Sequence, residues 1–322
     1  MDDRHPAAAQ AGAPRPAGAP WRVRRAGVVI RPHMDGRMGA NVQGPSLLRM
    51  PDWAEGRLGR YHLYFADHRG TYIRLAYADA VGGPWRMHEP GSLQLGESLF
   101  PTLPPPAIPA PAAERLDGHA PPGTPGIPSP EEDAAVPHIA SPDVHVDEER
   151  REILMYVHGL AAHGTQRTRL AVSRDGVRFA ALPELLGPSY VRVFRHAGAS
   201  HALVMPGVLY RSEDGRGGFV RGPQIFPGTR QRHTAVLVRD GVLHVFWTRV
   251  GDAPERVLHS RVPLRGDWRD WRVEGEPAEL LRPEHDWEGA DLPVAPSWRS
   301  AVNLPVNQLR DPAVFADADG RL

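Results

Sequence analysis

Four acidic residues stand in sequence contexts that suit acid–base chemistry. Asp311 lies in the tripeptide Arg-Asp-Pro at 310–312, and Asp143 follows a Ser-Pro pair. Glu255 and Glu288 lie in polar segments between expected strands. Two carboxylates held in different environments can divide such chemistry, one keeping a proton and one staying ionised. We take Asp311 as the base or orienting carboxylate, Glu255 as the acid, Asp143 as a third partner and Glu288 as the substitute for Glu255.

Each candidate also has an ordinary structural interpretation. An Asp next to Pro often only caps the backbone of a turn, which applies to Asp143 and Asp311. Glu255 could form a surface ion pair with Arg256, which would contribute little to stability. His233 could be a hydrogen-bonded histidine of the core. The sequence alone leaves these alternatives open.

Composition excludes several other chemistries. The chain has no Cys, which excludes disulfides, thiolate metal sites and a Cys nucleophile. Its 16 His include no HExxH pattern, so we expect no metal and no organic cofactor. Lys and Arg together number 38, as do Asp and Glu, so nothing predicts nucleic acid or a membrane as a partner. No apolar run approaches the roughly 20 residues of a membrane span.

Proline marks two segments outside the expected core. Of the 35 Pro in 322 residues, many fall in residues 1–20 and 101–137. Both segments have too few large apolar side chains to offset the entropy of ordering them. We therefore expect a disordered tail at 1–20 and one domain at 21–322 with a disordered Pro-rich insertion at 101–137. Residues 1–20 also lack the apolar stretch of a secretory signal, which predicts a cytoplasmic protein.

The remaining sequence repeats one pattern of strands. Runs rich in β-branched and aromatic residues, such as 61–65, 152–157 and 242–247, are typical of strands. A second strand with an Asp-Gly-type turn and an aromatic residue follows each run in a recurring form. The copies lie at 75–85, 170–179, 209–219 and 258–268. Such recurrence predicts a repeat protein.

A further strand precedes each unit, and these strands define the repeat. Repeats of about 40–50 residues with several strands each are typical of β-propellers. We therefore predict an all-β, five-bladed propeller rather than a β-sandwich, which would have no recurrent motif. The fifth repeat begins near Arg310, so its blade is incomplete, or Trp21–Ile30 closes the ring as a borrowed strand. The five expected starts are residues 44, 141, 190, 233 and 311.

This pattern resembles the five-bladed propeller glycosidases of glycoside hydrolase families 43 and 32. Arg310-Asp311-Pro312 and Ser141-Pro142-Asp143 at the inner-strand starts carry the resemblance. It implies hydrolysis of a glycosidic bond by three carboxylates that converge at one mouth of the central channel. Asp311 matches one typical carboxylate motif of that superfamily. The resemblance also implies a small carbohydrate or glycoside as ligand, and it allows a calcium ion in the channel near His233.

Two motifs depart from that superfamily. The first blade has Gln43-Gly44-Pro45 where an Asp is usual, and the third repeat opens with Tyr190-Val191-Arg192. A non-catalytic propeller that binds a carbohydrate or a protein partner is therefore the alternative function. The retained Arg-Asp-Pro and the long segment 282–309 favour the hydrolase.

Propeller geometry predicts which polar residues meet. The inner-strand starts and the hairpins between second and third strands converge on one funnel, where ligands commonly bind. We expect Trp287 to stack on a sugar ring and the other candidates to bind hydroxyl groups. The predicted substrate-binding residues are His68, Arg69, His158, Arg192, Arg232, His233, Arg249, Trp287 and Arg310.

Overall fold

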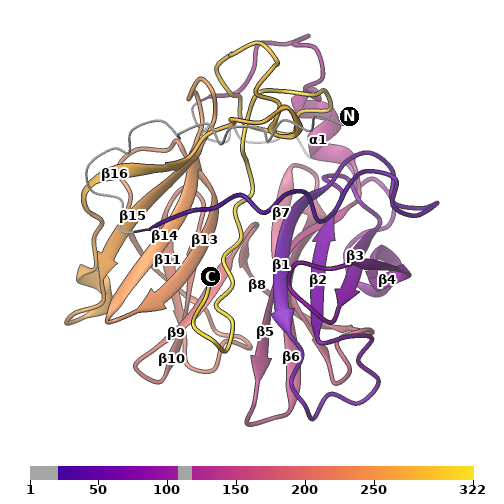
Figure 1. The fold of residues 1–322 in the computed structure, drawn as a ribbon, viewed down its shortest axis with the longest axis vertical. Helices are drawn as coiled ribbons and strands as arrows, with labels where there is room; N and C mark the ends of the chain where they lie inside the picture. Colours follow the sequence, from indigo (N-terminus) through magenta and orange to yellow (C-terminus); the bar gives the residue numbers. More distant parts are fainter. Residues whose placement is uncertain (1–20, 108–117) are drawn as a thin grey trace, which may run out of the picture.

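The computed structural model describes residues 21–107 and 118–322, and it is an all-β propeller (Figure 1). The predicted tail at 1–20 lies outside these residues. Four antiparallel four-stranded sheets form the blades, each in sequential strand order. Within the described ranges no helix is long and apolar enough to cross a membrane.

The strands follow the chain blade by blade. Blade 1 contains β1 (Gln43–Arg49), β2 (Tyr61–Ala66), β3 (Tyr72–Ala78) and β4 (Arg86–Gln94). Blade 2 contains β5 (Ile139–Asp147), β6 (Glu152–Ala162), β7 (Thr165–Ser173) and β8 (Ala180–Pro188). Blade 3 contains β9 (Arg192–His196), β10 (Ala199–Val204), β11 (Val208–Ser212) and β12 (Val220–Gln224). Blade 4 contains β13 (Gln231–Arg239), β14 (Val242–Arg249), β15 (Val257–Pro263) and β16 (Glu274–Leu281). Short helices are η1 (Leu95–Glu97), α1 (Pro130–Ala135), η2 (Trp268–Asp270) and η3 (Asp286–Glu288).

The prediction of five blades is wrong, because the structure has four. Residues 310–316 occupy the fifth inner position as an extended segment that forms no strand. Their backbone groups have no backbone hydrogen bond within the part of the chain that the structure describes. Trp21–Ile30 forms no strand either, so it does not close the ring by strand pairing.

A fivefold pattern nevertheless remains at the inner starts. Gly44, Ser141, Tyr190, His233 and Asp311 all have left-handed backbones, with φ between 47° and 61°. A non-Gly residue in this region costs of order 1–3 kcal/mol and persists only where its surroundings enforce it. Strand pairing becomes irregular at the starts of β1, β5 and β13, where this residue interrupts the ladder. These five positions are the same five inner-strand starts that the sequence repeat predicts.

Side chains of the C-terminal segment close the ring between blades 4 and 1. Val314 packs in an apolar cluster that includes Phe246 of β14 and Trp21. Phe315 meets the Tyr61 ring of β2 edge-on, with centroids 6.1 Å apart. The Tyr61 hydroxyl also donates to Asp317 at 2.7 Å. Figure 1 shows this yellow segment running down between the two blades.

The recurring Asp-Gly turn joins neighbouring blades. The Tyr64 hydroxyl of blade 1 donates to the Gly176 carbonyl of blade 2 at 2.7 Å. The Tyr156 hydroxyl of blade 2 likewise donates to the Gly215 carbonyl of blade 3 at 2.8 Å. These buried hydroxyls therefore find partners across the blade boundary, which explains why the turn recurs.

Residues 118–137 of the Pro-rich insertion pack over one end of the propeller, where Figure 1 shows α1. For this part the structure differs from the expectation of disorder at 101–137, while residues 108–117 lie outside the description. Asp133 of α1 accepts a hydrogen bond from Arg69 at 2.9 Å and another from Ser300. The Ala134 carbonyl accepts from the backbone N–H of Gly164 at 2.8 Å. Polar contacts hold this segment in place. Its low apolar content, on which the expectation of disorder rests, therefore does not indicate that it packs on the propeller.

We predict that Gly176→Ala destabilises the protein more than Gly241→Ala. Both glycines are left-handed, with φ of 69° and 72°, so each substitution costs about 1–2 kcal/mol from the backbone. A Cβ at Gly176 would also lie 2.9 Å from the hydroxyl oxygen of the buried Tyr64 and 2.6 Å from the terminal methyl of Met50, whereas the one at Gly241 meets no atom within 4 Å. Overpacking adds about 1–3 kcal/mol. Urea unfolding measures the loss of unfolding free energy in both variants. Equal losses would contradict the close packing around Gly176.

Candidate functional site

A cavity of about 920 Å³ lies at the end of the propeller where the inner segments begin. Its floor includes the left-handed residues Ser141, Tyr190, His233 and Asp311. His68 and His158 line it from blades 1 and 2. Its roof comes from the insertion, including Glu132 and Asp133, and from Arg299 and Ser300. We call this space the mouth cavity.

Asp311 presents a negative charge to the floor of the mouth cavity. Its Oδ1 accepts a hydrogen bond from the Tyr190 hydroxyl and lies 3.9 Å from Nε2 of His233. Burial, the largest influence, raises the pKa of Asp311, but His233 and the Tyr190 hydrogen bond outweigh it and leave that pKa below its ordinary value. The carboxylate is therefore ionised at neutral pH.

Histidines surround this carboxylate in their neutral form. Burial lowers the pKa of His68 to about 4, and burial also lowers the pKa values of His138, His158 and His233. The enclosed Nδ1 of His158 has no hydrogen-bond partner within the described ranges. A neutral imidazole offers one donor and one acceptor, which suits hydroxyl groups. His138 does not itself line the mouth cavity, and its Nδ1 lies 2.8 Å from the Val136 carbonyl.

Glu255 lies beneath the floor in a cluster of positive groups. Its side chain is fully buried, accepts a hydrogen bond from Nε of Arg232 at 2.9 Å and forms an ion pair with Arg310, whose Nε lies 3.1 Å away. Its backbone carbonyl accepts from the N–H of Leu309 at 2.9 Å. Burial lowers the pKa of Arg310 to about 10, which leaves it charged at neutral pH. Glu255 thus binds the C-terminal segment to blade 4.

These surroundings do not fit Glu255 to the role of acid. Burial, the largest influence, raises the pKa of Glu255, but Arg232, His233 and Arg310 outweigh it and hold that pKa far below its usual range. A general acid must keep its proton near the working pH. The surface pair with Arg256 does not form either, because Arg256 contacts Glu279 at 3.1 Å instead.

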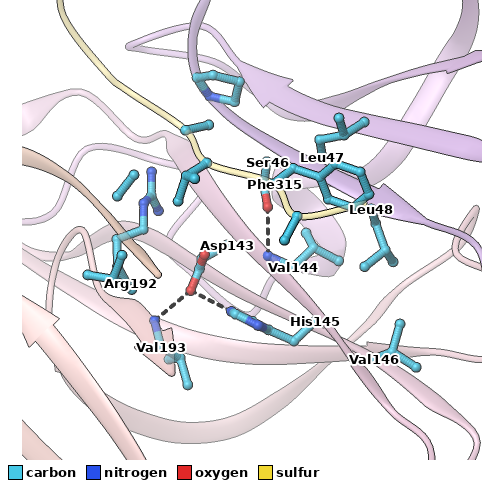
Figure 2. Close-up of a pocket in the computed structure, with 16 residues that line it drawn as sticks. Ser46, Leu47, Leu48, Asp143, Val144, His145, Val146, Arg192, Val193 and Phe315 are labelled. Atoms are coloured by element: carbon cyan, nitrogen blue, oxygen red, sulfur yellow. Dashed lines mark hydrogen bonds and ion pairs between the residues drawn. The ribbon is translucent and has the colours of Figure 1, made fainter. Parts of the chain in front are cut away.

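Asp143 lies in the central channel rather than in the mouth cavity. Figure 2 shows its carboxylate turned toward His145 and Val193, whose N–H groups donate to it at 2.8 and 2.7 Å. Burial, the largest influence, raises the pKa of Asp143, but His145 outweighs it together with Arg192 and leaves that pKa lowered. This channel cavity of about 230 Å³ is lined by Asp143 and by Phe315 of the C-terminal segment. Asp143 and Asp311 therefore face different spaces.

Arg192 connects three inner segments between these two cavities. Its Nε donates to the Thr234 carbonyl at 3.0 Å, and its Nη1 donates to the Ser141 carbonyl at 3.3 Å. Its guanidinium lies 4.5 Å from the centroid of the Tyr190 ring. Arg192 therefore positions the floor and does not line the mouth cavity.

Of the predicted site residues, His68, His158, Arg232 and His233 line the mouth cavity, but five further ones do not: Arg69, Arg249, Trp287, Glu288 and Arg310. Glu288 accepts from Arg25 at 2.8 Å and from backbone N–H groups of its own loop. Trp287 is 47% exposed and stacks on His285 rather than on the cavity wall. Arg249 lies against Trp247 in a separate cavity of about 320 Å³. The long loop 282–309 reaches the mouth through Arg299 and Ser300 instead.

Glu132 and Asp133 are the mouth carboxylates that sequence reasoning missed. Both lie in α1, inside the segment expected to be disordered. A signal was present, because Ser129 and Glu132 form a capping box, whose Ser-x-x-Glu pattern marks a helix start.

The residues near His233 do not fit the calcium ion that the family resemblance allows. The carboxylate of Glu255 is already bound by Arg232 and Arg310, which also add positive charge. Calcium needs six to eight oxygen ligands. Across residues 21–107 and 118–322 no group of three His, Asp or Glu side chains could hold a metal ion.

The fold is shared with solved glycoside hydrolases. An endo-1,4-β-xylanase from Bacteroides thetaiotaomicron matches with a TM-score of 0.50 and 12% identity, over 87% of this chain and 81% of that one. An exo-β-1,3-galactanase from Clostridium thermocellum matches with a TM-score of 0.48 and 13% identity, over 76% of this chain. The chain spans half the length of that galactanase chain. A family-43 glycoside hydrolase is also among the similar structures. At these identities the likeness concerns the fold.

Sequence similarity defines the family. The chain is 31% identical over 301 residues to the uncharacterized protein R118 of Acanthamoeba polyphaga mimivirus, covering 86% of this chain and 78% of that protein. No family model matches the chain. The chain therefore belongs to the family of protein R118.

We predict that Glu255→Gln destabilises the protein by about 3–5 kcal/mol at pH 7, because it leaves Arg232 and Arg310 without a buried counter-charge. The folded pKa of Glu255 is depressed, so its stabilising effect is complete above pH ~4.5 and is lost as the pH falls through the folded pKa. Urea unfolding at several pH values measures this effect. The free energies of unfolding of the variant and the parent should therefore become more similar below pH ~4.5.

Glu284→Gln is the matched control, since that side chain is 52% exposed and pairs only with Arg25. If Glu255→Gln lowers the free energy of unfolding no more than Glu284→Gln does, the buried Glu255 cluster does not stabilise the fold as we predict.

Proposed function

We propose that the mouth cavity binds a small saccharide or glycoside. The observation that carries this proposal is the combination of one ionised carboxylate, Asp311, with the neutral imidazoles of His68, His158 and His233. Sugar hydroxyls donate and accept hydrogen bonds, so they complement both kinds of group. The cavity volume of about 920 Å³ lies within the range usual for small-molecule sites.

The floor is built to keep this arrangement fixed. Tyr190 donates to Oδ1 of Asp311, and Arg192 lies against the Tyr190 ring. Glu255 binds Arg310, the residue before Asp311. Preorganised polar groups bind a ligand with less loss of side-chain freedom. Glu255 is therefore proposed as a positioning residue, and His158, whose ring lines the cavity, as a direct contact.

Glycoside hydrolysis is the second candidate function. A pair of carboxylates must flank the scissile bond, one ionised and one protonated. Asp311 supplies an ionised group on the floor, and Glu132 and Asp133 stand in the roof of the same cavity. The fold shared with family-43 enzymes supports this candidate, and the missing carboxylates at Gly44 and Tyr190 favour binding alone.

We predict that Asp311→Asn weakens saccharide binding by about tenfold or more, because a charge-assisted hydrogen bond contributes roughly 1.5–3 kcal/mol. Titration calorimetry with galactose, xylose, arabinose and their 4-nitrophenyl glycosides measures the affinities. Asp240→Asn is the control, because Asp240 is an exposed turn residue with a similar left-handed φ of 52°. The proposal fails if the parent binds none of these ligands, or if both variants bind like the parent.

Hydrolysis requires a further result from the same glycosides. Asp311→Asn should then abolish release of 4-nitrophenol. Glu132→Gln should slow cleavage of alkyl glycosides far more than that of nitrophenyl glycosides, because only a poor leaving group needs a proton. Asp133 is less suited to be the acid, because Arg69 donates a hydrogen bond to its carboxylate. Binding without any cleavage by the parent would reject hydrolysis and retain saccharide binding.

A further inference from the structure

A second hollow lies between blade 3 and η2, away from the mouth cavity. It has a volume of about 340 Å³ and is lined by His196, His201, Arg211, Trp268, Arg269 and Trp271, among others. It adjoins the turn between β9 and β10, which Figure 1 shows at the end of the propeller opposite α1. We call it the blade-3 hollow.

The sheet presents one row of side chains to this hollow. His201 of β10 lies directly opposite Phe194 of β9 and Arg211 of β11. The rings of His201 and Phe194 are stacked, with centroids 5.3 Å apart and planes 18° apart. Cross-strand neighbours on one face lie within contact distance, so Arg211 stands beside His201 on a rigid sheet.

The opposite wall comes from the η2 segment. Trp271 is 3% exposed, and its ring centroid lies 5.0 Å from that of His201 and 5.4 Å from that of His196. Trp268 packs on Gly222 of β12, where an added Cβ would come within 2.1 Å of the indole. Only glycine permits this approach, so the wall is fixed by close packing.

Several polar groups of the hollow lack partners. Nε1 of Trp271 and Nδ1 of His201 are enclosed and have no hydrogen-bond partner among the described residues. In the same ranges Arg211 forms no hydrogen bond and no ion pair. Arg269, by contrast, lies 3.6 Å from Asp267.

The unmatched groups indicate the chemistry of a ligand. Asp267 is the carboxylate that lines the hollow, and it is paired with Arg269, so Arg211 contributes a positive charge that has no ion-pair partner among the described residues. A guanidinium binds planar or tetrahedral oxyanions through paired hydrogen bonds. We propose that the blade-3 hollow binds the carboxylate or phosphate group of a small ligand through the guanidinium of Arg211, against the ring of Trp271.

Titration calorimetry of the Asp311→Asn variant with glucuronate, inorganic phosphate and neutral glucose tests this proposal, because that variant has a weakened saccharide affinity at the mouth cavity and an unchanged blade-3 hollow. We expect one anion to bind, with glucose at least about tenfold weaker, since a charge-assisted contact is lost. Binding of glucuronate alone identifies a carboxylate ligand, and binding of phosphate alone identifies a phosphate ligand. The proposal is overturned if neither anion binds, or if glucose binds as well as the anion does.

Substitutions locate the binding. Arg211→Gln should weaken anion binding by about tenfold or more, whereas Arg221→Gln should leave it unchanged. Arg221 is the matched control, because it is an exposed arginine on β12 of the same blade. If Arg211→Gln does not fold, Arg211→Lys keeps the charge without the planar fork and should still weaken binding. An anion that binds the folded Arg211 variant as well as the parent contradicts the assignment.

Spectroscopy separates this hollow from the mouth cavity. The indole N–H resonance of Trp271, assigned with Trp271→Phe, should shift on addition of the bound anion. Asp311→Asn should not alter this shift, because Asp311 lines the mouth cavity and not the blade-3 hollow. A failure of saccharide binding at the mouth would therefore leave this inference intact, and an unmoved Trp271 signal would refute it.

Discussion

One buried carboxylate, Glu255, fixes the geometry on which the mouth depends. A fully buried charge is tolerated only when it is paired, and Glu255 is paired with guanidinium groups of Arg232 and Arg310. Arg232 belongs to blade 4, whereas Arg310 belongs to a segment that has no blade of its own. This cluster therefore replaces the strand pairing that would otherwise hold the fifth inner position. Asp311, the next residue, is held in the ring as a result.

Backbone strain at the mouth has the same structural basis. Tyr190, His233 and Asp311 keep left-handed backbones although each has a side chain that disfavours them. Their side chains contact one another, through the Tyr190 hydrogen bond to Asp311 and the 5.7 Å spacing of the Tyr190 and His233 rings. Strain of this kind clusters where a site must be preorganised. The same three residues form the floor of the proposed saccharide site.

The sequence predicts local features of this fold better than long-range contacts. All five inner starts, from Gly44 to Asp311, were predicted because turns and strands leave short-range signals. The number of blades was not, because no local signal shows whether 310–316 finds a partner strand. The surroundings of Glu255 depend on Arg310, which is far away in the chain. The residues next to Glu255 in the sequence therefore look the same whether Glu255 is a general acid or a buried partner of an arginine. The place of Asp133 in the mouth cavity was not predicted, because polar contacts hold α1. The expectation of disorder for its segment considered only the number of large apolar side chains.

The positioning of Asp311 by Glu255 can be measured through the carboxyl pKa of Asp311, by carbon-13 NMR titration of the parent and of Glu255→Gln. We expect the pKa of Asp311 in the parent to lie below 3.8, because His233 and Tyr190 stabilise the ionised form. Loss of the buried cluster should release Arg310, displace Asp311 from Tyr190 and raise that pKa. An ordinary pKa in the parent, or the same lowered value in the folded variant, would contradict the claim that Glu255 positions the mouth carboxylate.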